Sequence, residues 1–143
     1  MPSISFFCED IDFILNRKLA IKQWISDVIS LENKIKGNIS FIFCNDEYLS
    51  KINIQYLKHD TLTDIITFDY TDDNHGKISG DIFISIDRVK ENAEKLDIPF
   101  LNELHRVMIH GVLHLMGYKD KTKTSKILMH QKEDKCLSLQ KNN

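Results

Sequence analysis

The sequence predicts a single α+β domain in which a mixed four-stranded sheet packs against about five helices. Short runs of β-branched and aromatic residues indicate strands, whereas longer segments with apolar residues every three or four positions indicate helices. The elements come in the order strand, helix, strand, followed by a strand pair and then helices. No internal repeat, linker or low-complexity segment divides the chain, so we expect one domain over residues 1–143.

The expected strands cover residues 4–8, 39–44, 64–70 and 80–86. The polar segment DDNHGK between the last two is typical of a hairpin loop. Gly37 and Asn38 are expected to end the first helical unit, Asn45 or Asp46 to cap the second helix, and Gly117 to end the fourth. The five expected helices cover residues 18–31, 46–56, 87–97, 101–116 and 125–140.

Length and composition are those of an ordinary globular domain. A chain of 143 residues can bury roughly two-thirds of the surface that its unfolded form exposes. Hydrophobic residues make up 42% and charged residues 28%, which gives no sign of disorder. The formal net charge of -2 provides no overall basic character, so a nucleic-acid partner would have to bind a local patch.

The N-terminal segment and the cysteines bear on the cellular compartment. Glu9, Asp10 and Asp12 interrupt the first apolar stretch, no basic region precedes it, and no segment has the length of a membrane span. The three cysteines are an odd number, widely spaced and set among apolar neighbours, so we expect buried thiols in a reducing compartment: Cys8, Cys44 and Cys136. None has the electropositive local sequence of a catalytic thiolate.

Two histidines in the most apolar predicted helix indicate a metal site. His110 and His114 are four residues apart, which places both imidazoles on one helical face, about 40° apart and one turn along the axis. Gly117 allows the chain to turn back at the helix end and bring Asp120 to the same point. The pattern HxxxHxxGxxD matches the long zincin spacing, with aspartate as the third ligand. We therefore predict one zinc ion, on the helix 101–116 and its following turn.

Other interpretations of these residues remain open. His110 and His114 are ordinary core or surface histidines if no metal is bound, and Asp120 lies between two lysines that would suit a solvated charge run. Three protein ligands leave a coordination position for water, as in catalytic zinc sites. Metalloproteases carry a glutamate base directly after the first histidine, where this chain has Gly111, so the sequence argues against a peptidase.

The motif HGVLHLMGYKD, together with TDIITF at 63–68 and GDIFIS at 80–85, resembles the YbeY family of bacterial rRNA-maturation endoribonucleases. The resemblance covers nearly the whole chain, and the family's usual motif is HGxLHLxGYDH. Its first two metal histidines fall on His110 and His114, and its third falls on Asp120. A site with two histidines and an aspartate carries one less net positive charge than one with three histidines, so we expect a weaker Lewis acid.

The resemblance implies one metallo-endoribonuclease domain over residues 1–143 that holds a single zinc ion and cleaves single-stranded RNA with metal-activated water. It further implies maturation of the 16S rRNA 3′ end and late 70S ribosome quality control in the cytoplasm, with the small ribosomal subunit and an assembly GTPase as partners and no membrane. Many relatives carry an arginine after the tyrosine, in a run like YRxKDxPTD, where this chain has Leu57. Lys58 or His59 could replace it or lie in a solvated loop.

Several residues near the motif could serve an RNA substrate. A cluster of lysines could hold a polyanion near the metal or simply keep the loop soluble: Lys119, Lys121, Lys123 and Lys126. Glu103 and Arg106 share the helical face of His110 and could support the ligands, contact phosphate or pair with each other. Tyr118 could stack on a base or pack the turn. Three residues coincide with a family motif, although they could simply make hydrogen bonds at the start of a strand: Thr63, Asp64 and Thr67. We expect the remaining histidines to lie outside the site: His75, His105 and His130.

These residues are compatible with three functions. A zinc-dependent endoribonuclease needs no carboxylate base beside the metal, because the metal can polarise a phosphoryl oxygen and activate water. A non-catalytic ribosome-assembly factor with structural zinc would need a fourth protein ligand, and none is evident nearby in the sequence. A zinc peptidase-like hydrolase would have to work without its usual base.

Overall fold

The computed structural model describes residues 2–57, 63–72 and 75–140. It contains one mixed four-stranded sheet in the order β1-β2-β4-β3, formed by β1 (Ile4–Cys8), β2 (Ile35–Cys44), β3 (Ile65–Asp69) and β4 (Lys77–Ser85). Strand β2 pairs in parallel with β1 and β4, whereas β3 pairs antiparallel with β4 and forms an edge of the sheet. The predicted α+β class and mixed sheet are confirmed.

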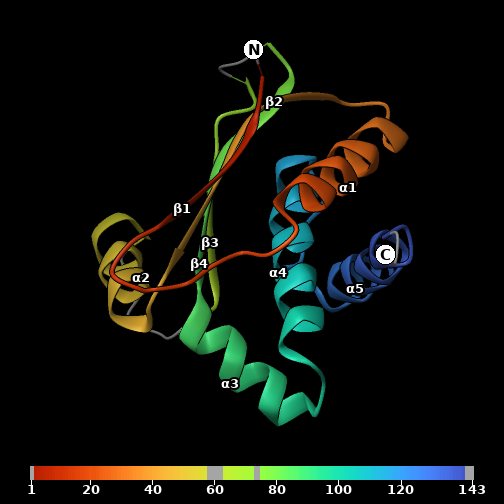
Figure 1. Cartoon of the computed structure of the whole chain (residues 1–143). Coiled ribbons are helices and arrows are strands. Elements are labelled where there is room, and N and C mark those ends of the chain that lie inside the picture. Colours follow the sequence, from red (N-terminus) through yellow and green to blue (C-terminus); the bar gives the residue numbers. More distant parts are fainter. Residues whose placement is uncertain (1, 58–62, 73–74, 141–143) are drawn as a thin grey trace.

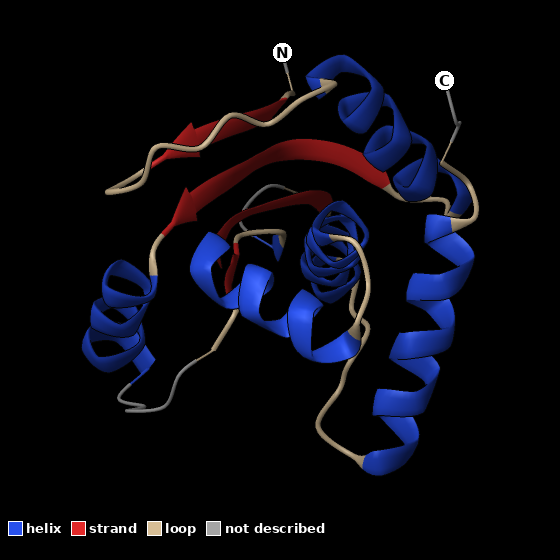
Figure 2. Cartoon of the chain, turned by 60° about the horizontal axis from the view of Figure 1, so that its bottom comes forward, coloured by secondary structure: helices blue, strands red, loops and turns tan. Residues whose placement is uncertain are grey.

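Helices lie on both faces of this sheet (Figure 1). On one face lie α1 (Lys18–Leu31) and α4 (Phe100–Leu115), and α2 (Asp46–Ile52) lies on the other. A π-helical turn, Asn53–Leu57, continues α2. Helix α3 (Ile86–Leu96) follows β4 directly, and α5 (Lys123–Leu137) packs on the outer side of α4, as Figure 2 also shows. None of the helices in the described parts of the chain is long and apolar enough to cross a membrane.

The larger hydrophobic core lies between the sheet and α1, α3 and α4. It includes Trp24 and Ile25 of α1, Phe41 of β2, Ile82 of β4 and Met108 of α4, all of them buried. A smaller core lies beneath α2, where Leu49 packs with buried residues of β2 and β3. Strand alternation explains both cores, because successive side chains of a strand point to opposite faces of the sheet.

Two local expectations were wrong. Gly37 and Asn38 do not end the first helical unit: α1 ends at Leu31, and both residues lie inside β2. The pairing of β2 with β4 shifts register between Lys36 and Ile39, so this Gly-Asn pair forms an irregularity within a strand. Cys8 is exposed and its thiol contacts the Phe13 carbonyl, whereas Cys44 and Cys136 are buried as expected. Burial raises the pKa of Cys44 to about 12, which keeps this thiol protonated.

Candidate metal centre

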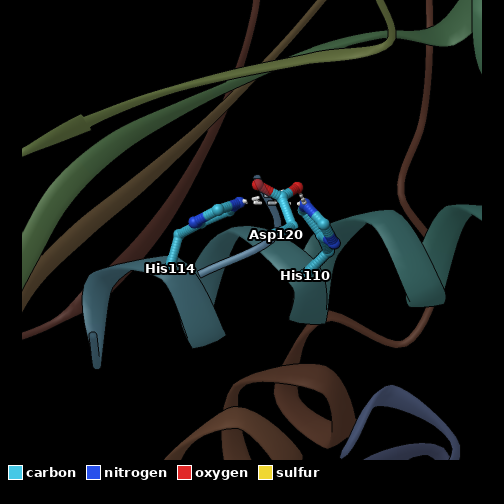
Figure 3. A group of neighbouring side chains, drawn as sticks. All are labelled: His110, His114 and Asp120. Carbon is cyan, nitrogen blue, oxygen red and sulfur yellow. Dashed lines mark hydrogen bonds and ion pairs between the residues drawn. The ribbon is translucent and has the colours of Figure 1, made fainter. Parts of the chain in front are cut away.

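Helix α4 and the turn after it position the three predicted ligands. His110 and His114 both lie in α4, which ends in a tight turn at Gly117, whose φ is 100°. The N–H groups of Gly117 and Tyr118 donate to the carbonyls of His114 and Leu113, both at 3.0 Å, which is the Schellman arrangement. The chain thereby reverses direction and brings Asp120 back over the last two turns of the helix, as Figure 3 shows.

The donor atoms of these residues form a nearly equilateral triangle. The Nε2 atoms of His110 and His114 are 3.1 Å apart. Oδ2 of Asp120 lies 3.2 Å from the first of them and 3.3 Å from the second. Ligand atoms of a tetrahedral zinc ion, at bond lengths near 2.1 Å, are separated by about 3.3–3.5 Å. Among the described residues, these three form a cluster of histidine and acidic side chains that could hold a metal ion.

A carboxylate on the neighbouring helix fixes the orientation of His110. Nδ1 of His110 donates to Oε2 of Glu133 in α5 at 2.5 Å, so its Nε2 presents a lone pair to the triangle. Such a histidine–carboxylate pair is the usual support for a metal-ligating imidazole. Burial alone would raise the pKa of Glu133, but hydrogen bonds from His110 and Arg106 outweigh it and hold that pKa below its ordinary value.

The two histidines differ in their electrostatic setting. Burial lowers the pKa of His110, but the bond to Glu133 and the charges of Asp120 and Asp64 outweigh it, so the net shift is upward. The pKa of His114 is lowered by burial and by its neighbour His110. Negative charge is concentrated around His110, whereas His114 resists protonation. This setting favours the binding of a metal cation between the two rings over the protonation of both.

Glu103 and Arg106 lie where the helical spacing placed them, beside His110 and lining the same cavity. They do not form the ion pair with each other that was one alternative. Arg106 instead bridges to α5, donating to Oε1 of Glu133 at 2.8 Å and also to Asp134. Glu103 is buried, and its Oε1 has no hydrogen-bond partner within the described residues.

The other residues considered from the sequence have clear positions. Tyr118 packs the turn, because its hydroxyl donates to Glu32, the residue after the end of α1, at 2.5 Å. Thr63 bonds the carbonyl of Ile65 at the start of β3, while Asp64 lines the cavity next to His110. Lys58 and His59 lie outside the described residues. The lysines of the following segment are all exposed, and none of the three remaining histidines joins the metal group in the part of the chain that is described: His75, His105 and His130.

Glu133 was missed by the sequence analysis. It lies 23 residues after His110, so its contact depends on how α5 docks against α4. One signal was present: Met129, Glu133 and Cys136 are the buried residues of α5 and follow a four-then-three spacing. A charged residue at such a core position indicates a buried partner of opposite charge.

The comparisons with known proteins identify the family of this chain. The profile of the endoribonuclease YbeY family matches residues 8–141. The chain belongs to this family. Proteins named endoribonuclease YbeY from Flavobacterium psychrophilum and Christiangramia forsetii are each 53% identical to it, over 93% and 95% of this chain and 94% and 93% of their own lengths.

A solved structure supports the fold of this YbeY family member independently. The solution structure of a protein from Thermotoga maritima superposes with a TM-score of 0.65 at 24% sequence identity. It covers 94% of this chain and 87% of the other. At that level of identity, the likeness concerns the fold alone.

Proposed function

We propose that this chain is a zinc-dependent, single-strand-specific endoribonuclease, formed as one metallo-endoribonuclease domain over residues 1–143. The observation that carries the proposal is the triangle of His110, His114 and Asp120 donor atoms in a chain of the endoribonuclease YbeY family. Its biological roles would be maturation of the 16S rRNA 3′ end and late 70S ribosome quality control in the cytoplasm. Its partners would be rRNA, the small ribosomal subunit and an assembly GTPase.

The donor set suits zinc and a hydrolytic role. Two imidazole nitrogens and one carboxylate oxygen are accepted zinc ligands, and three donors are the number found in catalytic sites. When bound there, zinc would polarise a phosphoryl oxygen and lower the pKa of a neighbouring water molecule. Glu133 holds the His110 ring in place through its Nδ1, and the Schellman turn at Gly117 holds Asp120 over the helix.

Exposed cations surround the turn that carries Asp120. Four lysines lie within or next to it, and none forms an ion pair within the described residues: Lys119, Lys121, Lys123 and Lys126. They are free to contact the phosphates of a single strand passing over the triangle, and such contacts weaken with salt. These lysines are a local basic patch of the kind that a nucleic-acid partner would need, because the chain as a whole has a net charge of -2.

The packing of Gly111 argues against a peptidase. The position that carries the glutamate base in metalloproteases faces the sheet here, because a Cβ at Gly111 would lie 2.9 Å from Cγ2 of Ile82 and 3.1 Å from Cδ1 of Ile65. A glutamate at this position would be driven into the interface between α4 and the sheet. Both the residue and the space for such a base are therefore missing.

An assay on three substrates separates the three functions. Purified protein, its His114→Ala variant and a chelator-treated sample would be tested on single-stranded RNA, double-stranded RNA and casein, with zinc content measured alongside. His75→Ala is the matched control, because His75 is exposed in the hairpin loop and does not belong to the metal group. We expect cutting of single-stranded RNA by the wild type and the control alone.

The other outcomes are equally informative. RNA cutting that survives removal of the metal would overturn the proposed mechanism. Full zinc content without any RNA cutting would favour an assembly factor with structural zinc. Cutting of casein would favour the peptidase-like hydrolase despite the packing of Gly111.

A further inference from the structure

A cavity of about 150 Å³ lies directly beside the candidate metal centre. His110 belongs to both, since its Nε2 faces the triangle and its ring lines the cavity. The interior is formed by buried residues of α4 and α5, namely Glu103, Val107 and Glu133. The remaining lining residues are partly exposed, so that the cavity is open to solvent: Asp64, Ile65, Arg106 and His110.

Glu103 is the polar group of this cavity that lacks a partner. It is only 6% exposed, and its Oε1 is enclosed without a hydrogen bond in the described part of the chain. The other charged groups are paired: Glu133 with His110 and Arg106, and Asp64 with the side chain of Asn92. A buried carboxyl group left without a donor is costly, so the position calls for a ligand that brings N–H groups.

The size and lining of the cavity restrict that ligand. A cavity of this volume in another protein accepts benzene, so a single six-membered ring fits. Ile65 and Val107 provide apolar surface for the faces or edges of such a ring. Burial raises the pKa of Glu103, as does the nearby charge of Asp64, because both disfavour the ionised carboxylate. An N–H group that donates a hydrogen bond to this carboxylate would stabilise its ionised form.

We propose that this cavity receives the base of a cytidine next to the RNA bond that is cut, with the Glu103 carboxyl group accepting a hydrogen bond from the N4 amino group. This inference rests on the proposed function. Carboxylates recognise cytosine through this amino group, whereas uracil presents the O4 acceptor at the same place and would face the carboxylate with like partial charge. A purine, with two fused rings, would only partly enter a cavity of this volume.

Nucleotide binding to the zinc-loaded full chain tests the inference without any cleavage. The probes are cytidine, uridine and adenosine 5′-monophosphates, titrated by calorimetry and by NMR of the methyl groups of Ile65 and Val107. We expect cytidine monophosphate to bind about tenfold more tightly than uridine monophosphate, with shifts at both methyl-bearing residues. In Glu103→Gln the preference should fall towards one, because a carboxamide can rotate to face either N4 or O4.

Glu94→Gln is the matched control. Glu94 is exposed on α3, outside the cavity, so this variant should keep the preference for cytidine. Zinc content and cooperative thermal unfolding would be recorded for both variants. If Glu103→Gln does not fold, the wild-type methyl shifts decide alone: equal shifts with both pyrimidine nucleotides, or shifts confined to residues 119–126, would overturn the inference.

Cleavage then separates this inference from the proposed function. On an oligouridine strand with one internal cytidine, the wild type should cut next to the cytidine, and Glu103→Gln should cut without that preference. Absence of RNA cutting together with retained cytidine selectivity would overturn the nuclease function and leave the pocket assignment standing. Efficient cutting with equal binding of cytidine and uridine nucleotides would overturn the pocket assignment alone.

Discussion

Asp120 is the one proposed ligand whose residue type differs from the family's usual histidine. Its oxygen lies within 3.3 Å of both imidazole nitrogens, and its side chain is about one-third exposed. An aspartate reaches less far than a histidine, and the Schellman turn brings the backbone of this residue over α4, within reach of both imidazoles. A carboxylate also removes one net positive charge from the site, which weakens its pull on a phosphoryl oxygen.

Substitution of Asp120 tests its role as a ligand. We expect Asp120→Ala to lower zinc occupancy and Asp120→His to retain it, because imidazole is an equally good donor for zinc. Zinc per chain would be measured by mass spectrometry after dialysis against a weak chelator. Unchanged occupancy in the alanine variant would remove Asp120 from the site.

Glu133 should contribute to metal affinity without touching the metal. In Glu133→Gln the charged acceptor for Nδ1 of His110 becomes neutral, so we expect zinc affinity to fall about 10- to 100-fold. The measurement is competition with a fluorescent chelator. Asp134→Asn is the control, because Asp134 also pairs with Arg106 but does not contact His110. Equal loss in both variants would show that the Arg106 pairing matters, and not support of His110.

These residues also show which parts of the site the sequence can predict. His110 and His114 share a face because a helix repeats every 3.6 residues, a purely local property. Asp120 follows from a glycine that ends the helix. Glu133 depends on the docking of α5 against α4, a tertiary arrangement that local spacing does not encode. The unpartnered carboxyl of Glu103 likewise becomes evident only when the packing around it is known.

Helix α4 carries the histidines and also forms the main contact of the helical layer with β3 and β4. Gly111 makes this double role feasible, since a Cβ at this position would lie only 2.9 Å from Cγ2 of Ile82 and 3.1 Å from Cδ1 of Ile65. The packing of α4 on the sheet, and with it the position of the two histidines, therefore depends on the absence of a side chain at Gly111.

The Gly111→Ala variant tests this coupling. Alanine would gain about 1 kcal/mol of helix propensity. Overpacking against a fully buried Ile82 costs about 1–3 kcal/mol. We expect net destabilisation, seen as a lower melting temperature. Adding Ile82→Val removes Cδ1, one of the atoms that the new Cβ would meet, so the two substitutions should cost less together than the sum of each alone. A higher melting temperature for Gly111→Ala alone would contradict this account.

At the level of elements, periodicity placed the helices and strands well, and the errors have physical causes. Gly37 and Asn38 are strong turn formers, yet β2 continues through them because parallel pairing with β4 resumes after a register shift. Helix α5 begins at Lys123, two residues before the expected start, because Thr122 and Ser125 form a capping box. In β2, pairing with the neighbouring strand overrides the turn preference of Gly37 and Asn38. In α5, side-chain capping determines the residue at which the helix begins.

In the parts of the chain that the structure describes, the sheet has a large helical layer on one face, and α2 with its π-helical turn on the other (Figure 1). Asp46 joins these parts at the carboxyl ends of β2 and β4. Its two oxygens accept hydrogen bonds from Oγ of Ser85 and Nη2 of Arg88, both at 2.8 Å. The first residue of α2 is thereby tied to the end of β4 and to the first turn of α3. Loss of this tie would loosen α2 from the sheet.

The charge of Asp46 gives this tie a pH dependence. Burial raises the pKa of Asp46, but the bonds from Arg88 and Ser85 outweigh it, and the folded-state pKa lies below its ordinary value. In the unfolded chain the pKa returns to about 3.9. The stabilisation is therefore present above about pH 4 and is lost as the pH falls through the folded-state value.

Urea unfolding, measured from about pH 6 down to about pH 3, tests this dependence. The free energy of unfolding should fall less steeply with decreasing pH in Asp46→Asn than in the wild type. Asp12→Asn, at an exposed position, should follow the wild type. Parallel curves for all three proteins would place the acid sensitivity elsewhere.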